Sequence, residues 1–231
     1  MNIAIIPARG GSKRIPRKNI KEFCGKPMIA WSIEAALNSG CFNHVIVSTD
    51  DEEIATVSRQ HGAETPFMRP SVLADDYTGT SAVVRHAIQW FVDQDQTPDK
   101  VCCIYATAPF VQPEDLVQGA RLLGENGCSH AFSVTTFPFP IQRAIKATEN
   151  GGCTPIFPEH IGKRSQDLEE TYHDAGQFYW ARAETWLTGK EVFNPASRMI
   201  HLPRYRVQDI DTPEDWDRAE LLFKALGQAR R

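Results

Sequence analysis

The residues best suited to chemistry lie directly after the first apolar run of the chain. Residues 2–6 form that run, and the stretch that follows contains two glycines and five basic side chains, which are Arg9, Lys13, Arg14, Arg17 and Lys18. Glycine lets the backbone approach an anion, and N–H groups and cations neutralise its charge. Arginine adds a planar fork of donors and lysine a mobile point charge. The segment predicts a polyphosphate site, and hence a nucleotide-using enzyme; a solvated basic loop is the alternative.

This basic loop matches neither of two common nucleotide motifs. It lacks the pattern G-x-x-x-x-G-K-[ST], and it also lacks G-x-G-x-x-G. The prediction of phosphate binding therefore depends on the order of residues seen here and on their place directly after a predicted strand.

A pair of aspartates near the other end of the chain predicts a metal site. In an extended segment, residues two positions apart share a face, so Asp209 and Asp211 can project together. Their carboxylates repel each other unless a cation lies between them, and Mg²⁺ takes oxygen ligands and works with substrate phosphates. The alternative is an exposed Asp209 and an Asp211 that only assists the start of the next helix.

Two further segments carry polar side chains of suitable types. Residues 69–76 place Arg69 and two aspartates shortly before Thr80, where they can meet a base, a ribose or a phosphate; a plain surface loop is the alternative. His173 stands among polar residues just before an apolar run. No catalytic Ser/His/Asp or Cys/His arrangement can be identified from spacing, and the histidines show no HxxxH or HExxH pattern.

Strands and helices alternate along the chain and are expected to position these residues. Apolar runs predict strands at residues 2–6, 45–48, 101–105, 131–135 and 178–181. Amphipathic patterns predict helices at about 27–39, 50–61, 80–91, 113–126 and 213–226. Such alternation favours an α/β fold with a mostly parallel sheet and helices on both faces. In that fold ligands bind beyond the carboxyl ends of the strands, and the basic loop leaves from such an end.

Local signals predict where the helices begin and which faces they bury. The predicted N-terminal caps are Asp50 (with Glu53 in a capping box), Thr80 and Thr212. Pro27 and Pro113 suit the first turn of a helix, and Gly40 and Gly127 follow helix ends. The apolar face of the first helix is predicted to comprise Ile29, Ile33, Ala36 and Leu37.

Residues 136–175 interrupt the alternation. They are rich in proline and glycine, yet they also contain apolar side chains that a plain linker does not need, such as Phe137, Phe139, Ile156 and Phe157. We therefore expect a single domain over residues 1–231, in which residues 136–175 form a folded insertion that covers a substrate or meets a second subunit.

Composition and charge exclude several classes. The chain has 231 residues, 42% of them hydrophobic and 23% charged, which is ordinary for a globular protein. A net charge of −4 argues against a general nucleic-acid binder, and no apolar run approaches the roughly 20 residues of a membrane span. The first apolar run is too short for a secretory signal. Six cysteines without a CxxC pair predict reduced thiols, which favours the cytoplasm.

Several of these segments resemble one family of enzymes. Residues 6–19, Ile-Pro-Ala-Arg-Gly-Gly-Ser-Lys-Arg-Ile-Pro-Arg-Lys-Asn, are similar to the signature of the acylneuraminate cytidylyltransferases, the CMP-sialic acid synthetase family. The similarity continues in the same order at residues 25–27, 47–50, 69–74 and 209–212. It spans nearly the whole chain.

The resemblance implies a Rossmann-like nucleotidyltransferase fold, a homodimer, and transfer of CMP from CTP to the anomeric hydroxyl of a nonulosonic acid with Mg²⁺ and release of pyrophosphate. It implies a catalytic set of Lys13, Lys18, Asp209 and Asp211, with both aspartates as Mg²⁺ ligands. It implies CTP contacts from Ala8, Arg9, Gly10, Gly11, Ser12, Lys13, Lys18, Asn19, Arg69 and Thr80.

Two departures from the family pattern bear on the sugar. Sialic acid enzymes commonly carry Leu-Gln-Pro-Thr-Ser-Pro where this chain has residues 104–109, Ile-Tyr-Ala-Thr-Ala-Pro, and Arg-Pro-Asn-Gly where it has residues 172–176. Residues 139–144 and 172–179 instead resemble the branch that uses pseudaminic acid. That resemblance implies sugar contacts from Gln142, Arg143, Tyr172 and His173, with Arg143 a candidate for the sugar carboxylate.

The alternatives within the class are cytidylyltransferases for N-acetylneuraminate, legionaminate or Kdo. The alternative from another class of protein is a non-catalytic nucleotide-sugar-binding module. The presence of Lys13, Lys18, Asp209 and Asp211 argues against it, because a binding module would not need the full set of phosphate and metal ligands. The general base and the number of metal ions stay open. By the resemblance, the activated sugar serves flagellin glycosylation or surface polysaccharide, and neither nucleic acid nor membrane is an expected partner.

Overall fold

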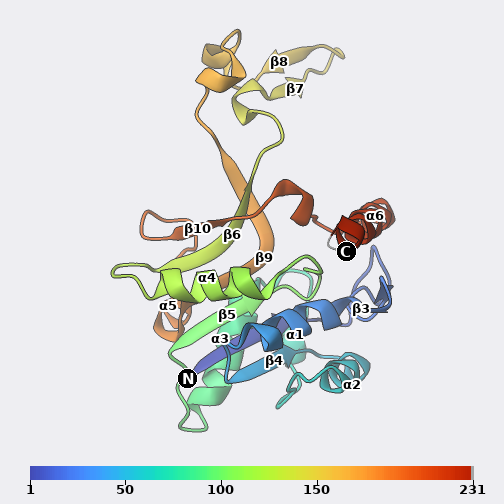
Figure 1. The fold of residues 1–231 in the computed structure, drawn as a ribbon, viewed down its shortest axis with the longest axis vertical. Helices are drawn as coiled ribbons and strands as arrows, with labels where there is room; N and C mark the ends of the chain where they lie inside the picture. The colour runs from blue at the N-terminus through green and yellow to red at the C-terminus, as the bar shows by residue number, and fades with distance from the viewer. Residues whose placement is uncertain (230–231) are drawn as a thin grey trace.

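The computed structural model describes residues 1–229, and a six-stranded sheet runs through its body (Figure 1). The strand order is β10-β6-β9-β5-β1-β4. Five strands run parallel, and β9 lies antiparallel between β5 and β6. The predicted mostly parallel sheet is confirmed. The strands are β1 (Asn2–Pro7), β4 (His44–Ser48), β5 (Lys100–Ile104), β6 (His130–Thr136), β9 (Tyr172–Arg182) and β10 (Arg198–His201).

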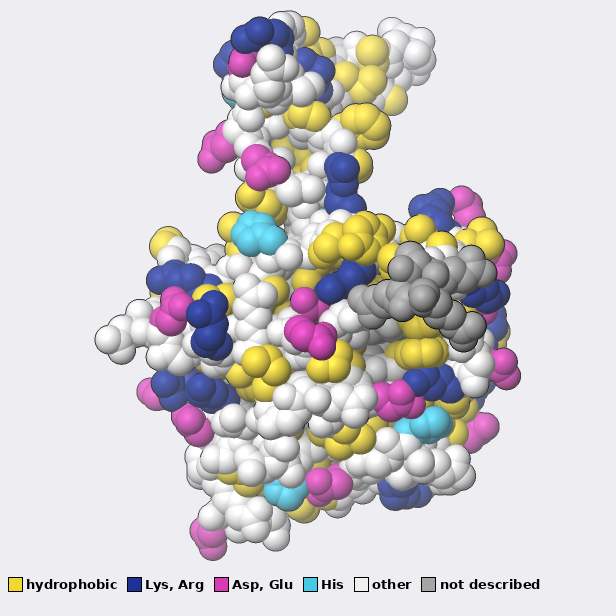
Figure 2. Space-filling model, in the orientation of Figure 1, with side chains coloured by type: hydrophobic (Ala, Val, Ile, Leu, Met, Phe, Trp, Pro, Cys, Tyr) yellow, Lys and Arg dark blue, Asp and Glu magenta, His cyan; other side chains and the backbone are white. Residues whose placement is uncertain are grey.

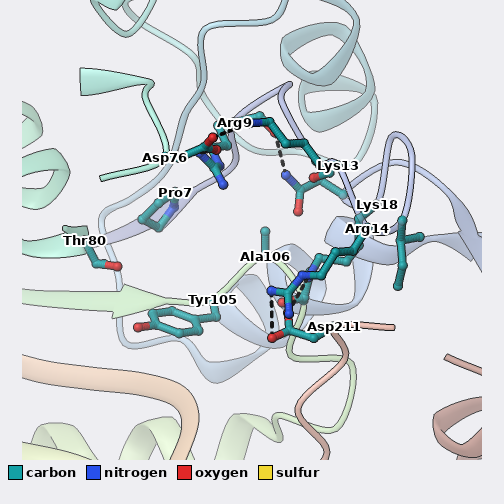
Figure 3. Close-up of a pocket in the computed structure, with 14 residues that line it drawn as sticks. Pro7, Arg9, Lys13, Arg14, Lys18, Asp76, Thr80, Tyr105, Ala106 and Asp211 are labelled. Atoms are coloured by element: carbon teal, nitrogen blue, oxygen red, sulfur yellow. Dashed lines mark hydrogen bonds and ion pairs between the residues drawn. The ribbon is translucent and has the colours of Figure 1, made fainter. Parts of the chain in front are cut away.

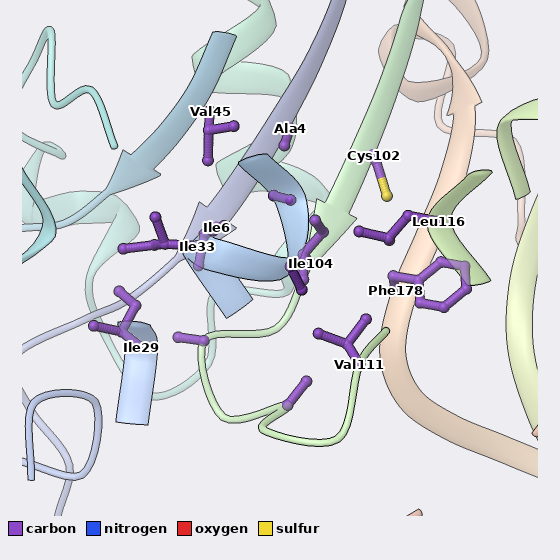
Figure 4. Packing of buried hydrophobic residues seen from close by; sticks show 14 of the residues in the cluster. Ala4, Ile6, Ile29, Ile33, Val45, Cys102, Ile104, Val111, Leu116 and Phe178 are labelled. Carbon is purple, nitrogen blue, oxygen red and sulfur yellow. The ribbon is translucent and has the colours of Figure 1, made fainter. Parts of the chain in front are cut away.

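Helices cover both faces of the sheet. α1 (Met28–Ser39), α2 (Glu52–Gln60) and α4 (Pro113–Leu123) pack on one face, where Figure 4 shows Ile33 and Leu116 against the strand residues Ile6 and Ile104. α3 (Thr80–Val92) and the short α5 (Ala183–Leu187) pack on the other face. Cys102 and Cys103 belong to opposite faces, as their adjacency in a strand requires, and both thiols are buried and free.

The last helix, α6 (Pro213–Ala229), packs away from the sheet. Its Trp216 lies edge-on to Phe23, which belongs to a small hairpin of β2 (Glu22–Phe23) and β3 (Lys26–Pro27). Thr212 caps the helix as predicted, because its hydroxyl accepts from the Asp215 N–H while the Asp215 carboxylate accepts from the Thr212 N–H. This packing brings residues 209–212 next to the loop that follows β1.

Four local predictions differ from the structure. Asp51, rather than Asp50, caps α2 by accepting from two backbone N–H groups, and Gly79 precedes α3, so Thr80 is its first residue. α4 ends at Leu123, before Gly124 rather than Gly127. Leu37 is 44% exposed, whereas Ala35 and Ala36 directly before it are buried. The predicted apolar face of α1 is otherwise buried.

Between β6 and β9 the chain leaves the body as an arm, residues 137–171 (Figure 1). The arm contains the hairpin of β7 (Ile145–Ala147) and β8 (Cys153–Pro155) and the 3-10 turns η2 (Ile141–Arg143), η3 (Pro158–His160) and η4 (Ser165–Asp167). The last four residues of the predicted insertion lie within the sheet instead, because β6 supplies partners for them; Thr136 pairs with Tyr172 and Thr135 with His173. Figure 2 shows the arm joined to the body by a narrow neck.

Among the described residues, no helix combines the length and the apolar character needed to cross a membrane.

Candidate active site

A cleft of about 530 Å³ lies beyond the carboxyl ends of β1 and β5 (Figure 3). The two strands are neighbours in the sheet, so the loops that follow them supply its walls. The loop before α6 closes one side with Asp211. The lining comprises Pro7, Arg9, Ser12, Lys13, Arg14, Ile15, Lys18, Asn19, Asp76, Thr80, Tyr105, Ala106, Thr107 and Asp211.

The basic loop after β1 is held against the N-terminus of α2. The Gly10 N–H donates to Asp50 Oδ1 at 3.0 Å, and a Cβ at Gly10 would lie 2.7 Å from Asp51 Oδ2. Arg17, which has a φ of 56°, pairs with Asp51 and Glu53 and so points away from the cleft. The Arg17 hydrogen bond holds the pKa of Asp51 below its usual value. The other four basic residues of the loop line the cleft.

Two groups of charges face each other across the cleft (Figure 3). On one side Asp76 pairs with Arg9 Nη1 at 2.6 Å and also with Lys13. The hydrogen bond from Lys13, followed by that from Arg9, lowers the pKa of Asp76. The carboxylate of Asp76 thus binds Arg9 and Lys13, two cations whose charge also suits a phosphate.

On the other side, Asp211 binds two cations. Its Oδ1 accepts from Lys18 Nζ at 3.2 Å and its Oδ2 pairs with Arg14 Nη2 at 2.9 Å. Lys18 Nζ also donates to the carbonyl of Ile210 at 2.7 Å. These contacts join the loop after β1 to a segment about 190 positions later in the chain. The predicted phosphate-binding loop and one of the two predicted metal ligands therefore lie side by side.

A smaller hollow adjoins the cleft and contains Arg69. It shares Pro7, Arg9, Asp76 and Thr80 with the cleft. The guanidinium of Arg69 is buried, and it donates to the hydroxyl and carbonyl oxygens of Ser48. Burial lowers the pKa of Arg69 to about 10, which leaves it protonated at neutral pH.

A third hollow, of about 400 Å³, shares Tyr105 and Thr107 with the cleft and contains Asp209 and His173. Burial, and next the charge of Asp211, raise the pKa of Asp209. The two carboxylates are therefore close enough to repel. Within residues 1–229 no group of three or more His, Cys, Asp or Glu side chains could hold a metal. Two carboxylates fit Mg²⁺, which commonly combines one or two of them with substrate phosphates and water.

The predicted sugar-side residues separate into two places. His173 lines the third hollow, and Tyr172 begins β9 beside it, with its hydroxyl bonded to Glu170. Gln142 and Arg143 lie in the arm, where they donate to the carbonyls of Glu169 and Lys163. Neither of these two is among the residues that line the cleft or the third hollow of this chain.

Some of the other predicted CTP contacts line the cleft and some do not. Ser12, Lys13, Lys18 and Asn19 line it, whereas Ala8 is buried beneath the loop and Gly10 contacts α2. Gly11 is open to solvent on its Cβ side.

Sequence reasoning missed several lining residues that a topological signal could have found. Tyr105 and Thr107 follow the carboxyl end of β5, where ligands are expected in such sheets. Asp174, Gly176 and Tyr179 reach the same edge only because β9 runs antiparallel, so that its early residues lie beside the end of β5. The direction of β9 was not predicted.

Comparison with known proteins assigns the class. Residues 3–190 match the family model described as cytidylyltransferase. The chain belongs to the cytidylyltransferase family, a family of nucleotidyltransferases that use CTP.

Two characterised relatives match nearly the whole chain. The pseudaminic acid cytidylyltransferase of Campylobacter jejuni subsp. jejuni serotype O:2 is 48% identical over 96% of both chains. The CMP-N,N'-diacetyllegionaminic acid synthase of Legionella pneumophila is 32% identical over 98% of both chains.

Solved structures share the fold. A CMP:2-keto-3-deoxy-manno-octonic acid synthetase in complex with CTP superimposes with a TM-score of 0.67 at 18% identity, covering 97% of this chain and 98% of the other. The 4-diphosphocytidyl-2C-methyl-D-erythritol synthase of Anaerococcus prevotii gives a TM-score of 0.64 at 13% identity, covering 96% and 98%. The expected Rossmann-like nucleotidyltransferase fold is confirmed.

Proposed function

We propose that this enzyme transfers CMP from CTP to the anomeric hydroxyl of pseudaminic acid and releases pyrophosphate. The observation that carries the proposal is a cationic cleft bordered by Asp211, with Asp209 in the adjoining hollow, found in a chain 48% identical to a pseudaminic acid cytidylyltransferase. The lower identity to the legionaminic acid enzyme, 32%, favours pseudaminate over that sugar.

The side chains of the cleft divide the work on CTP. Arg9 and Lys13 bind its phosphates in place of the Asp76 carboxylate, and Lys18 adds a third cation to the same anion while it contacts Asp211. The main-chain N–H of Gly11 approaches the same anion, and Arg69 and Thr80 contact the cytidine. The hydroxyl oxygen of the sugar forms a bond to the α-phosphorus as the bond to pyrophosphate breaks, and the hydroxyl proton is released to solvent. The cations stabilise the negative charge that builds on the leaving group.

Asp209 and Asp211 would hold Mg²⁺. Bound there, the ion would supply further neutralisation of phosphate charge. The protein's own part is to place both aspartates on the segment before α6, where Lys18 and Arg14 hold the Asp211 carboxylate.

We propose a homodimer built on the arm. Four apolar side chains of the arm face solvent in the single chain, among them Phe139, which is 80% exposed, with Ile145, Ile156 and Ile161. A two-stranded hairpin such as β7–β8 is marginal in isolation and gains stability from packing. In a dimer, Gln142 and Arg143 would reach the sugar site of the partner chain, since they do not line the cleft of their own chain.

The proposed setting is the cytoplasm of a bacterium, where CTP is available and reduced thiols persist. The activated sugar would then serve flagellin glycosylation or surface polysaccharide.

The test is pyrophosphate release from CTP with a panel of pseudaminate, N-acetylneuraminate, a legionaminate and Kdo. We expect the highest kcat/KM with pseudaminate and no turnover without Mg²⁺. Release with another sugar but not with pseudaminate would refute the choice of sugar alone. No release with any of them would leave a nucleotide-sugar-binding module as the better description.

A further inference from the structure

A fixed carboxylate lies in the third hollow, next to the CTP cleft. The Tyr179 hydroxyl donates to Asp174 Oδ2, and Tyr105 packs beside Tyr179 at the border between the two cavities. The two tyrosine rings contact each other, with centroids 5.5 Å apart. Tyr105 lines both cavities, whereas Tyr179 and Asp174 line only the hollow. In Figure 3, Thr80 and Tyr105 lie together, across the cleft from Asp211.

The bond between Tyr179 and Asp174 has one possible direction. A carboxylate only accepts, so the Tyr179 hydroxyl gives its single proton to Asp174 Oδ2. The Asp174 carboxylate therefore faces the hollow as a positioned acceptor.

Asp174 is held in place but not saturated. Its Oδ1 accepts from the Gly176 N–H at 2.9 Å and its Oδ2 from Tyr179, so each oxygen can accept one further bond. The tight turn that brings the Gly176 N–H back to this side chain needs a φ of 61° at residue 176, which glycine adopts without strain. The side chain of Asp174 is exposed toward the hollow, and Tyr179 beneath it is buried.

We propose that Asp174, positioned by Tyr179 and Tyr105, is a specificity-determining residue that accepts a hydrogen bond from an acylamino N–H or a hydroxyl of the acceptor sugar. This assignment rests on the proposed function. The sugar is itself an anion, so Asp174 repels its carboxylate and attracts its uncharged donor groups. The residue thus sets which end of the sugar enters the hollow, and it disfavours sugars with no donor at that point, because binding would take its carboxylate out of water without replacing the lost hydrogen bond.

The test compares isosteric variants by steady-state kinetics with pseudaminate and by calorimetric binding of CTP. Asp174→Asn removes the charge and half of the accepting capacity, so we expect the KM for the sugar to rise about tenfold to a hundredfold. The dissociation constant for CTP should stay within about twofold, since Asp174 does not line the CTP cleft. Tyr179→Phe removes the anchor of the carboxylate and should raise the sugar KM in the same direction by a smaller factor. Asp93→Asn, at the exposed C-terminal end of α3, is the matched control.

Three outcomes decide the matter. A raised sugar KM with unchanged CTP binding supports the assignment. An unchanged sugar KM in Asp174→Asn, or a parallel loss of CTP binding that indicates a structural role, overturns it while leaving the proposed function intact. If the wild-type enzyme releases no pyrophosphate with any sugar, the proposed function fails first and this assignment fails with it.

Discussion

At the scale of single residues, the conformation of the basic loop depends on a close approach between Gly10 and Asp51. A Cβ at Gly10 would meet Asp51 Oδ2 at 2.7 Å, and this oxygen cannot retreat because Arg17 and the N-terminus of α2 hold the carboxylate. We expect Gly10→Ala to lower the free energy of unfolding by about 1–3 kcal/mol. Gly11→Ala, where nothing lies within 4 Å, should change it by less than about 0.5 kcal/mol. Urea denaturation of both variants checks this, and equal losses would contradict it.

The pair between Arg17 and Asp51 also makes the loop sensitive to acid. Because the pKa of Asp51 in the folded state is lowered from 3.8, its contribution to stability is present above that value and is lost as the pH falls through the folded pKa. Asp51→Asn keeps a capping side chain but loses the charge. We expect the difference in unfolding free energy between wild type and this variant to shrink between about pH 5 and pH 3. A difference that stays constant over this range would show that the ion pair contributes nothing.

Asp211 is the residue at which the proposed phosphate and metal sites meet. Asp211→Asn keeps the shape of the side chain but removes a charge that Lys18 and Arg14 contact and that Mg²⁺ would need. We expect kcat at saturating Mg²⁺ and CTP to fall by about a hundredfold or more. Glu214→Gln, in the exposed first turn of α6, removes a nearby charge and should leave kcat within about twofold. A rate for Asp211→Asn equal to that of the control would exclude the proposed role.

At the scale of elements, a buried ion pair ties α4 to the segment that carries Asp209 and Asp211, the two proposed metal ligands. Arg206, in the 3-10 turn η5 (Arg204–Arg206), pairs with Asp115 of α4, and both side chains are only 13% exposed. Gln177 of β9 donates to the carbonyl of Arg206 at 2.6 Å. The segment before Asp209 is thus held from two sides, and burial raises the pKa of Asp115 despite the nearby arginine.

Breaking this pair should cost far more than breaking a surface pair. Asp115→Ala leaves the Arg206 charge buried and uncompensated, so we expect a loss of about 3–5 kcal/mol in the free energy of unfolding. Asp99→Ala breaks the exposed pair with Arg182 and should cost about 0–1 kcal/mol. Chemical denaturation of the two variants gives the comparison. Similar costs would mean that α4 and η5 are held by apolar packing alone.

At the scale of the whole molecule, residues 136–175 were expected to cover a substrate or to meet a second subunit. Most of them form the arm. It leaves the body at the end of β6 and returns at the start of β9, so its exposed apolar side chains can be changed without touching the sheet core (Figure 1). Figure 2 shows hydrophobic side chains on the arm and its neck, with basic side chains nearby.

The dimer prediction can be tested with paired surface variants. Light scattering should give about 52 kDa for the wild type, twice the 25.9 kDa of one chain. Phe139→Asp with Ile145→Asp should yield particles of about 26 kDa, because two charges would be buried in the contact. Leu221→Asp, at an equally exposed apolar site on α6, should leave the mass unchanged. A wild type of about 26 kDa would refute the dimer.

The sequence by itself determined the alternating strands and helices, the mostly parallel sheet and the class of enzyme. Periodicity and local caps depend on neighbours within a few positions, which is why the buried face of α1, except for Leu37, and the Thr212 cap were predicted correctly. The basic loop was recognisable as a candidate phosphate site because glycines and cations directly after a strand commonly bind anions.

Only the tertiary structure decided which polar residues share a cavity. The antiparallel direction of β9 brings Asp174 and Tyr179 beside Tyr105, and the packing of α6 brings Asp211 to Lys18. Ion pairs with Asp51 and Glu53 turn Arg17 out of the cleft, and Gln142 and Arg143 lie in the arm, away from the cleft of their own chain. These placements depend on contacts between residues far apart in the chain. No local pattern encodes them, because their free energy arises from the packing of the whole sheet and its helices.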